Sequence, residues 1–175
     1  SASILFSGII NSGRTEYFGK DFYFEYEEFI VDMPACDSVR IRPMPNKEQT
    51  SPRRLLSKLE DVRGVIYIDD PENKSGIDTS KHNYPILKTD KESYVYYDKR
   101  TIQNGVYDRE KFRFIVESFE MDSLDNFKDH ALRFDGTLIS ADIFPDFQES
   151  LAIQEDYSLG FIKKAPSNGY SIYGG

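Results

Sequence analysis

With 175 residues and 39% hydrophobic content, the chain is long enough to fold as one domain, or as two very small ones, without disulfides or metal ions. Its net charge of −8 argues against nucleic acid and anionic lipid headgroups as partners, because a protein that binds a phosphate backbone needs a basic face. No run approaches the roughly 18 consecutive apolar residues of a transmembrane helix, so we expect no transmembrane segment.

Aromatic residues alternate with polar ones early in the chain. Phe22, Phe24 and Tyr26 occupy every second position, which predicts a strand that continues to about residue 31. The segment 39–42 alternates in the same way, and the proline that follows cannot extend a hydrogen-bonded ladder. Between these strands, the carboxylate next to Cys36 raises the pKa of a neighbouring thiol. Cys36, the only cysteine, is therefore predicted to be a half-buried structural residue.

A helix is predicted near 52–62. Ser51 suits the N-cap position and Pro52 the first turn. At helical spacing, four apolar side chains share one face: Leu55, Leu56, Leu59 and Val62. Gly64 then ends the helix, and a short β-branched strand follows at 65–68.

Residues 72–91 are polar and without periodicity, which predicts a long loop. Further strands are predicted at 93–97, 111–116, 132–134 with 137–139, 151–153 and 159–162. The sum is a mostly-β chain (β-rich α+β) with antiparallel sheets, arranged as a sandwich or as a repetitive structure, and one short helix.

One stretch of the sequence echoes another. Five residues of the segment 17–32 recur 90 positions later in the segment 107–122: Tyr17, Phe22, Phe24, Phe29 and Asp32 match Tyr107, Phe112, Phe114, Phe119 and Asp122. Repeated β units stack so that each buries the face of its neighbour. The alternative interpretation is that aromatic strands resemble one another without repetition.

The chain begins and ends within strand-like patterns, which is what a segment cut from a longer protein would show. The stretches 22–32, 107–125 and 134–159 resemble segments of very large, uncharacterised envelope proteins of Gram-negative bacteria. This resemblance implies an exported, repetitive, β-rich parent located in the periplasm or at the cell surface. It implies no activity and no site residue.

Residues typical of catalysis or of a metal site are scarce. The chain has two histidines, and neither stands in a recognisable nucleophile or zinc pattern. The segment 69–78 offers carboxylates and a turn-forming glycine, but Pro71 falls where an EF-hand loop needs its first aspartate. An irregular calcium site and a simple turn both remain open for this segment. We predict no catalytic residue, no metal ligand and no cofactor.

Tyrosines are the best candidates for ligand contact. Tyr94 and Tyr96 share one face of their predicted strand, whereas Tyr97 points to the other face. Together with Tyr170 and Tyr173, they are the candidate platform for stacking on sugar rings. Core packing and cross-strand pairing account for the same residues without a ligand.

The sequence therefore favours a non-enzymatic structural or scaffolding segment of a larger exported envelope protein. Its partners would be neighbouring segments of the same parent chain, joined at the edges of its sheets. The alternative is a ligand-binding module, for carbohydrate through the tyrosines or for lipid in an apolar groove.

Overall fold

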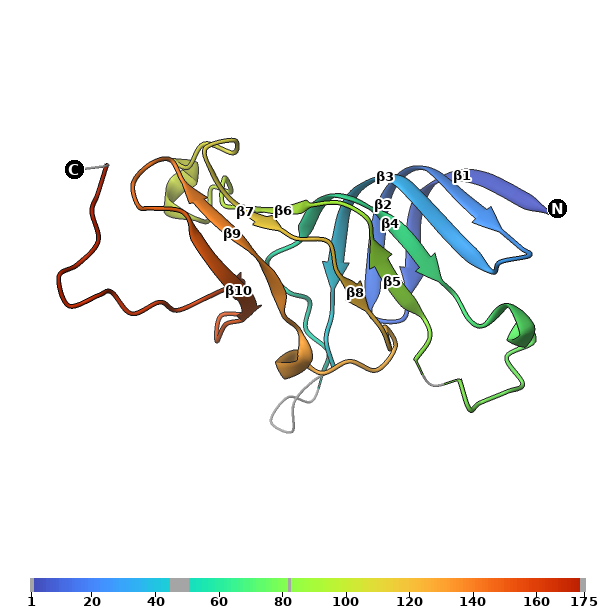
Figure 1. Ribbon diagram of the computed structural model, residues 1–175. Helices are drawn as coiled ribbons and strands as arrows, with labels where there is room; N and C mark the ends of the chain where they lie inside the picture. Colours follow the sequence, from blue (N-terminus) through green and yellow to red (C-terminus); the bar gives the residue numbers. More distant parts are fainter. Residues whose placement is uncertain (1, 45–50, 82, 174–175) are drawn as a thin grey trace.

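A computed structural model describes residues 2–44, 51–81 and 83–173 of the chain. Within these residues, eleven strands join in one sheet in which every strand pair is antiparallel (Figure 1). The strands are β1 (Ser3–Ser12), β2 (Thr15–Glu25), β3 (Ile30–Ile41), β4 (Leu59–Tyr67), β5 (Ile86–Thr89), β6 (Ser93–Tyr96), β7 (Phe112–Val116), β8 (Glu120–Met121), β9 (Phe134–Ser140), β10 (Phe147–Ile153) and β11 (Leu159–Gly160). Three short 3₁₀ turns accompany them: η1 (Pro71–Asn73), η2 (Gln103–Gly105) and η3 (Asp129–Ala131). The mostly-β, antiparallel fold predicted from the sequence is confirmed.

The sheet runs from one end of the molecule to the other in nearly sequential order. The strand order is β1-β2-β3-β4-β6-β7-β9-β10-β11, and β5 branches from β4 to pair with β8. The strand β1 lies at one end of the molecule, and the segment after β11 lies at the other end (Figure 1). Neighbouring strands in the sequence are therefore mostly neighbours in space, as short connections between antiparallel strands favour.

The first four strands carry irregularities that curl the sheet. The pairing of β1 with β2 shifts between Phe6 and Gly8, and Asp21 on β2 takes a positive φ of 57° at this point. The Asp21 backbone N–H donates to the Ser7 hydroxyl at 3.1 Å, so a side chain replaces a ladder partner. The pairings of β2 with β3 and of β3 with β4 also shift. Such bulges bend a strand and increase its twist.

The helix predicted near 52–62 is wrong. Residues 52–58 have no regular structure, and the segment from Leu59 onward forms β4. Leu59 and Val62 are both buried, although regular strand alternation would place residues three positions apart on opposite faces. The alternation breaks at Asp61, which has a φ of 55°, and this break returns Val62 to the buried face. A helix would have buried the same two residues. Leu56, which the helix would have buried, is 56% exposed. The pairing of β4 with β3 on one side and with β5 and β6 on the other overrides the local helical spacing.

Gly64, which was expected to end that helix, lies inside β4. A Cβ atom there would collide with the Lys88 backbone carbonyl on β5. The glycine therefore permits a close approach of the two strands rather than a stop.

The loop predicted at 72–91 is too long. Its last third contains β5, which pairs with β4 and β8. Leu87 and Thr89 are buried, and the Thr89 side chain accepts from the Phe119 backbone N–H at 2.8 Å. Only two apolar residues mark β5 in the sequence, Ile86 and Leu87, so the polar surroundings concealed a strand that other strands bury.

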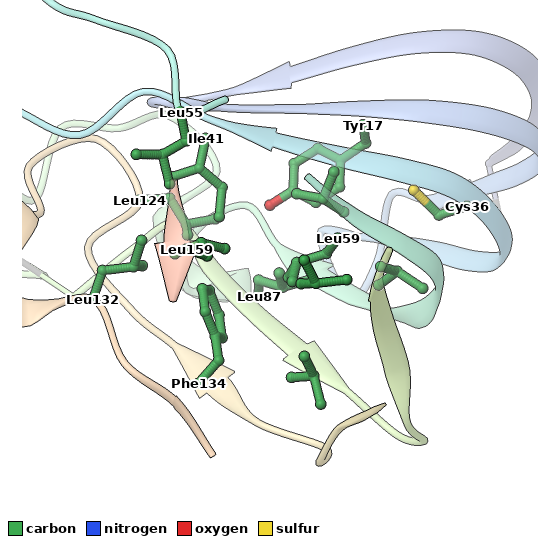
Figure 2. Packing of buried hydrophobic residues seen from close by; sticks show 14 of the residues in the cluster. Tyr17, Cys36, Ile41, Leu55, Leu59, Leu87, Leu124, Leu132, Phe134 and Leu159 are labelled. Carbon is green, nitrogen blue, oxygen red and sulfur yellow. The ribbon is translucent and has the colours of Figure 1, made fainter. Parts of the chain in front are cut away.

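One cluster of buried side chains fills the inside of the curled sheet. It takes residues from β2, β3, β4, β5, β6, β7, β9, β10 and β11 and from the loops between them. Figure 2 shows Ile41, Leu55, Leu124 and Leu159 grouped in this cluster, with Phe134 beside them. No helix among the described residues is long enough and apolar enough to span a membrane.

The two segments of the sequence echo correspond in part. Phe22 and Phe24 lie on β2, and Phe112 and Phe114 lie on β7, so both pairs belong to strands. Their burial does not correspond, because Phe22 is fully buried while its counterpart Phe112 is half-buried, and Phe24 is half-buried while its counterpart Phe114 is fully buried. The flanks differ: Tyr17 is a buried residue of β2, whereas its counterpart at position 107 lies outside any strand. The correspondence is therefore limited to the strands that carry the Phe pairs.

Candidate functional site

Tyr94 and Tyr96 lie side by side on β6, as their spacing predicted. Their rings stack with centroids 5.7 Å apart and an interplanar angle of 24°. The guanidinium of Arg109 lies 3.6 Å from the ring centroid of Tyr96, and that of Arg113 lies 5.0 Å from the ring centroid of Tyr94. One face of each ring is therefore in a cation–π contact with the protein itself.

The charges around Tyr96 hold this arrangement together. Its hydroxyl donates to Asp61 at 3.0 Å, and burial and this hydrogen bond raise the pKa of Tyr96 to about 12. Arg109, over the ring, also binds Glu60 at 2.8 Å and Asp98 at 3.1 Å. A sugar ring would have to displace a guanidinium that two carboxylates fix in place.

Tyr170 and Tyr173 belong to a different part of the molecule. They lie in the segment after β11, where the ring of Tyr170 packs on Phe144 and Phe147 with centroids 6.3 and 5.0 Å apart. Tyr173 is 73% exposed. The structure thus gathers the four tyrosines in two pairs on β6 and on the C-terminal segment, not in one platform.

Internal hydrogen bonds occupy the segment considered for calcium. The buried side chain of Asn73 donates to Asp69 at 3.0 Å and to the Asp78 carbonyl, and it accepts from the Asp78 N–H. A hydrogen bond from Lys81 lowers the pKa of Asp70. Among the described residues, no group of three His, Cys, Asp or Glu side chains is placed to hold a metal ion. The segment forms an Asx-type turn with its own partners.

Cys36 lies inside β3 and is 1% exposed. Its thiol donates to the carbonyls of Phe18 and Ser38, and burial raises its pKa to about 12. The neighbouring Asp37 contributes less to this rise than burial does. A thiol of this kind is protonated at physiological pH and is a poor nucleophile.

An apolar groove of about 440 Å³ lies between β8 and η3. Its apolar lining consists of Phe119, Met121, Phe127, Ala131, Leu132 and Phe134. The same groove is also lined by charged and titratable residues, namely Glu120, Asp122, Lys128, His130 and Arg133. This groove is the place in the structure that corresponds to the apolar groove expected for a lipid, and no pattern in the sequence marked its residues as a site.

The outer edge of β1 is the most unusual surface of the fold. This strand is the last in the sheet order, so one side of its backbone has no strand partner within the part of the chain that the structure describes. It is ten residues long and carries no charged side chain, in a protein of which 30% of residues are charged. Ile4, Leu5 and Ile9 are 59%, 67% and 60% exposed.

The other ends of the sheet are formed by strands that are much shorter than β1. The strands β11 and β8, which close the sheet order and its branch, have two residues each. Natural proteins protect sheet edges by such short strands, by charges and prolines along a long one, or by β-bulges. The edge of β1 is long and has no charge or proline, and its protection is limited to the shift of pairing between Phe6 and Gly8.

Both faces of the β1–β2 hairpin extend this apolar character. Phe6 packs against the core side of the hairpin, with its ring centroid 5.7 Å from that of Phe22. On the opposite face, Leu5 pairs with Tyr23, which is 38% exposed. A strand added next to β1 would therefore find apolar neighbours on both of its faces.

Comparisons of this chain with protein-family models, with curated proteins and with solved structures give no match.

Proposed function

We propose that this chain is a non-enzymatic structural segment of a larger exported envelope protein, and that β1 pairs with a strand from a neighbouring segment of that protein. The observation that carries the proposal is the free edge of β1. A long, uncharged, apolar strand with unpaired N–H and C=O groups is a template for another strand. The resemblance of three stretches to segments of large β-rich envelope proteins supplies the kind of parent.

The chemistry of β1 also defines its partner. The overall charge of −8 repels other acidic surfaces, but the edge itself contributes no charge to this repulsion. The added strand must bring apolar side chains opposite Leu5 and Ile9 and must place no charge there, since β1 has no counter-ion to offer. An uncharged, apolar strand from a similar unit satisfies both conditions.

The binding alternatives have weaker support. The ring faces of Tyr94 and Tyr96 are each in contact with an arginine, and the other tyrosine pair lies elsewhere. The apolar groove beside β8 has charged side chains in its lining. Neither feature combines an unsatisfied backbone with an exposed apolar surface as β1 does.

The edge can be tested in the isolated chain, where a second copy takes the place of the neighbouring segment. Sedimentation velocity of the purified chain should show association that increases with concentration. Leu5→Lys and Ile9→Lys place on the edge the residue that natural edges use for protection, and each should return the chain to a monomer. Because both side chains are largely exposed, the free energy of unfolding should change by no more than about 0.5 kcal/mol.

Ile77→Lys is the matched control. Ile77 is 81% exposed but lies in the loop after η1 and belongs to no strand, so this variant should associate like the wild type. A wild-type chain that stays monomeric at high concentration, or an Ile77→Lys variant as monomeric as the β1 variants, would overturn the proposal.

A further inference from the structure

Four arginines from three separate segments of the sequence line one cleft of this acidic protein. Arg14 lies in the turn between β1 and β2, Arg40 and Arg42 lie at the end of β3, and Arg54 precedes β4. The cleft has a volume of about 390 Å³. Its lining contains two carboxylates, Glu16 and Asp125, against the four guanidinium groups.

Backbone hydrogen bonds fix the elements that form this cleft. The Arg14 N–H donates to the Leu124 carbonyl at 2.7 Å, and the Arg42 N–H donates to the Arg14 carbonyl at 2.9 Å. The segment before β4 is attached in the same way, because the Leu55 N–H donates to the Ile41 carbonyl at 2.9 Å. The arginines therefore belong to segments whose backbone is fixed before a ligand binds, and this lowers the entropic cost of binding.

The carboxylates do not neutralise the arginines. Glu16 is the partner of both Arg54, at 3.4 Å, and Arg42, at 3.9 Å, so one carboxylate serves two guanidinium groups. Among the described residues no ion pair takes up Arg14, whose Nη1 donates to the Arg42 carbonyl at 3.4 Å.

Two lysines extend the positive surface on one side. A second, smaller hollow of about 270 Å³ shares Arg40 and Arg54 with the cleft and adds Lys58 and Lys99. The pKa of Lys99 is lowered, first by burial and then by the positive charges of Lys58 and Arg40. The local excess of positive charge therefore reaches beyond the cleft itself.

From the four guanidinium groups and the net positive charge of the lining, we propose that this cleft binds a phosphate monoester group. Guanidinium forks match the oxygens of phosphate in pairs, and an excess of two positive charges suits its dianion. The volume admits the phosphate together with a small group attached to it. The proposal is independent of the function proposed for β1.

Isothermal titration with inorganic phosphate and with glycerol 3-phosphate tests the site in the whole chain. Both probes should bind, glycerol alone should not, and the affinity should fall as NaCl is added, since salt screens exposed charges. Arg14→Gln and Arg54→Gln should each lower the affinity about tenfold or more, because each removes a charge-assisted hydrogen bond. Glu16→Gln should raise it severalfold, because the negative charge that competes for Arg42 and Arg54 is lost.

Arg63→Gln is the control with the same change of charge. Arg63 lies on β4, pairs with Asp90 and lines neither hollow, so its replacement should leave the affinity within about twofold of the wild type. If Arg63→Gln weakens binding as much as Arg54→Gln does, the attraction comes from general charge and the proposal fails. Absence of binding at millimolar phosphate and glycerol 3-phosphate would also overturn it.

A vesicle experiment identifies where the phosphate comes from. Vesicles of phosphatidylcholine with phosphatidic acid should retain the chain, in a manner sensitive to Arg54→Gln, if the ligand is a lipid headgroup. If the soluble phosphates bind while these vesicles retain no more chain than vesicles of pure phosphatidylcholine, the ligand is a soluble phosphate ester. Circular dichroism of each variant establishes that the fold is intact.

Discussion

Replacing Phe114 with alanine tests the packing of the buried cluster inside the sheet. Phe114 is fully buried on β7, between β6 and β9, and its ring centroid lies 6.2 Å from that of Phe161. Loss of the transfer free energy of a buried Phe accounts for about 1.5–3 kcal/mol. The cavity left behind brings the expected loss of unfolding free energy to about 3–5 kcal/mol.

Urea unfolding followed by circular dichroism measures this loss, and thermal unfolding should show a melting temperature lower by roughly 6–20 °C. Phe144→Ala is the control, because Phe144 is 37% exposed and contacts Phe147 and Tyr170 at the surface. It should lose about 1 kcal/mol. A loss for Phe114→Ala no larger than that of the control would refute the packing described here.

Three further outcomes follow from individual residues. In urea unfolding, Gly136→Ala should lose several times more unfolding free energy than Gly160→Ala. A Cβ at Gly136 would collide with the Ile115 backbone carbonyl, whereas a Cβ at Gly160 would meet the flexible side chain of Gln154. Equal losses would contradict the close spacing of β7 and β9. Burial raises the pKa of the Cys36 thiol from 9.0 to about 12 in the folded chain. The contribution of the protonated thiol to the free energy of unfolding is therefore fully present below about pH 9 and should be lost as the pH rises towards 12. A series of urea midpoints at increasing pH measures this loss. Reaction of Cys36 with a thiol reagent at pH 8 before unfolding would contradict its burial. Asn73→Ala should speed proteolytic cleavage within 74–81 with little change in melting temperature, and unchanged cleavage would show that other contacts hold this turn.

Strand alternation was the part of the fold that the sequence predicted well. The pattern around Phe22 and Phe24 identified the end of β2, and the pattern around Phe112 and Phe114 identified β7, because a half-buried strand must alternate whatever its partners are. The predicted continuation of the first strand to about residue 31 was wrong, because the chain turns after Glu25 and β3 begins at Ile30. The helix near 52–62 failed because Leu59 and Val62 fit two structures. Only the positive φ of Asp61, which depends on the neighbouring strands, places both side chains in the core of a sheet.

The two surfaces for which we propose a function could not be predicted, for two different reasons. The composition of β1 is visible in the sequence, since its ten residues carry no charge, but its place at the edge depends on the strand order. The four arginines of the cleft are spread over 40 residues, and they meet only because the turn after β1 lies beside the end of β3. A net charge of −8 therefore concealed a local excess of positive charge.

Hydrogen exchange of the β1 amides tests the central claim most directly. In an antiparallel edge strand, alternate N–H groups point towards β2 and towards solvent. At low protein concentration, the outward N–H groups of β1 should exchange rapidly and the inward ones slowly. At high concentration, the account predicts that the outward groups of β1 become protected, and that Leu5→Lys abolishes this protection. Association of the chain with no new protection along β1 would contradict it.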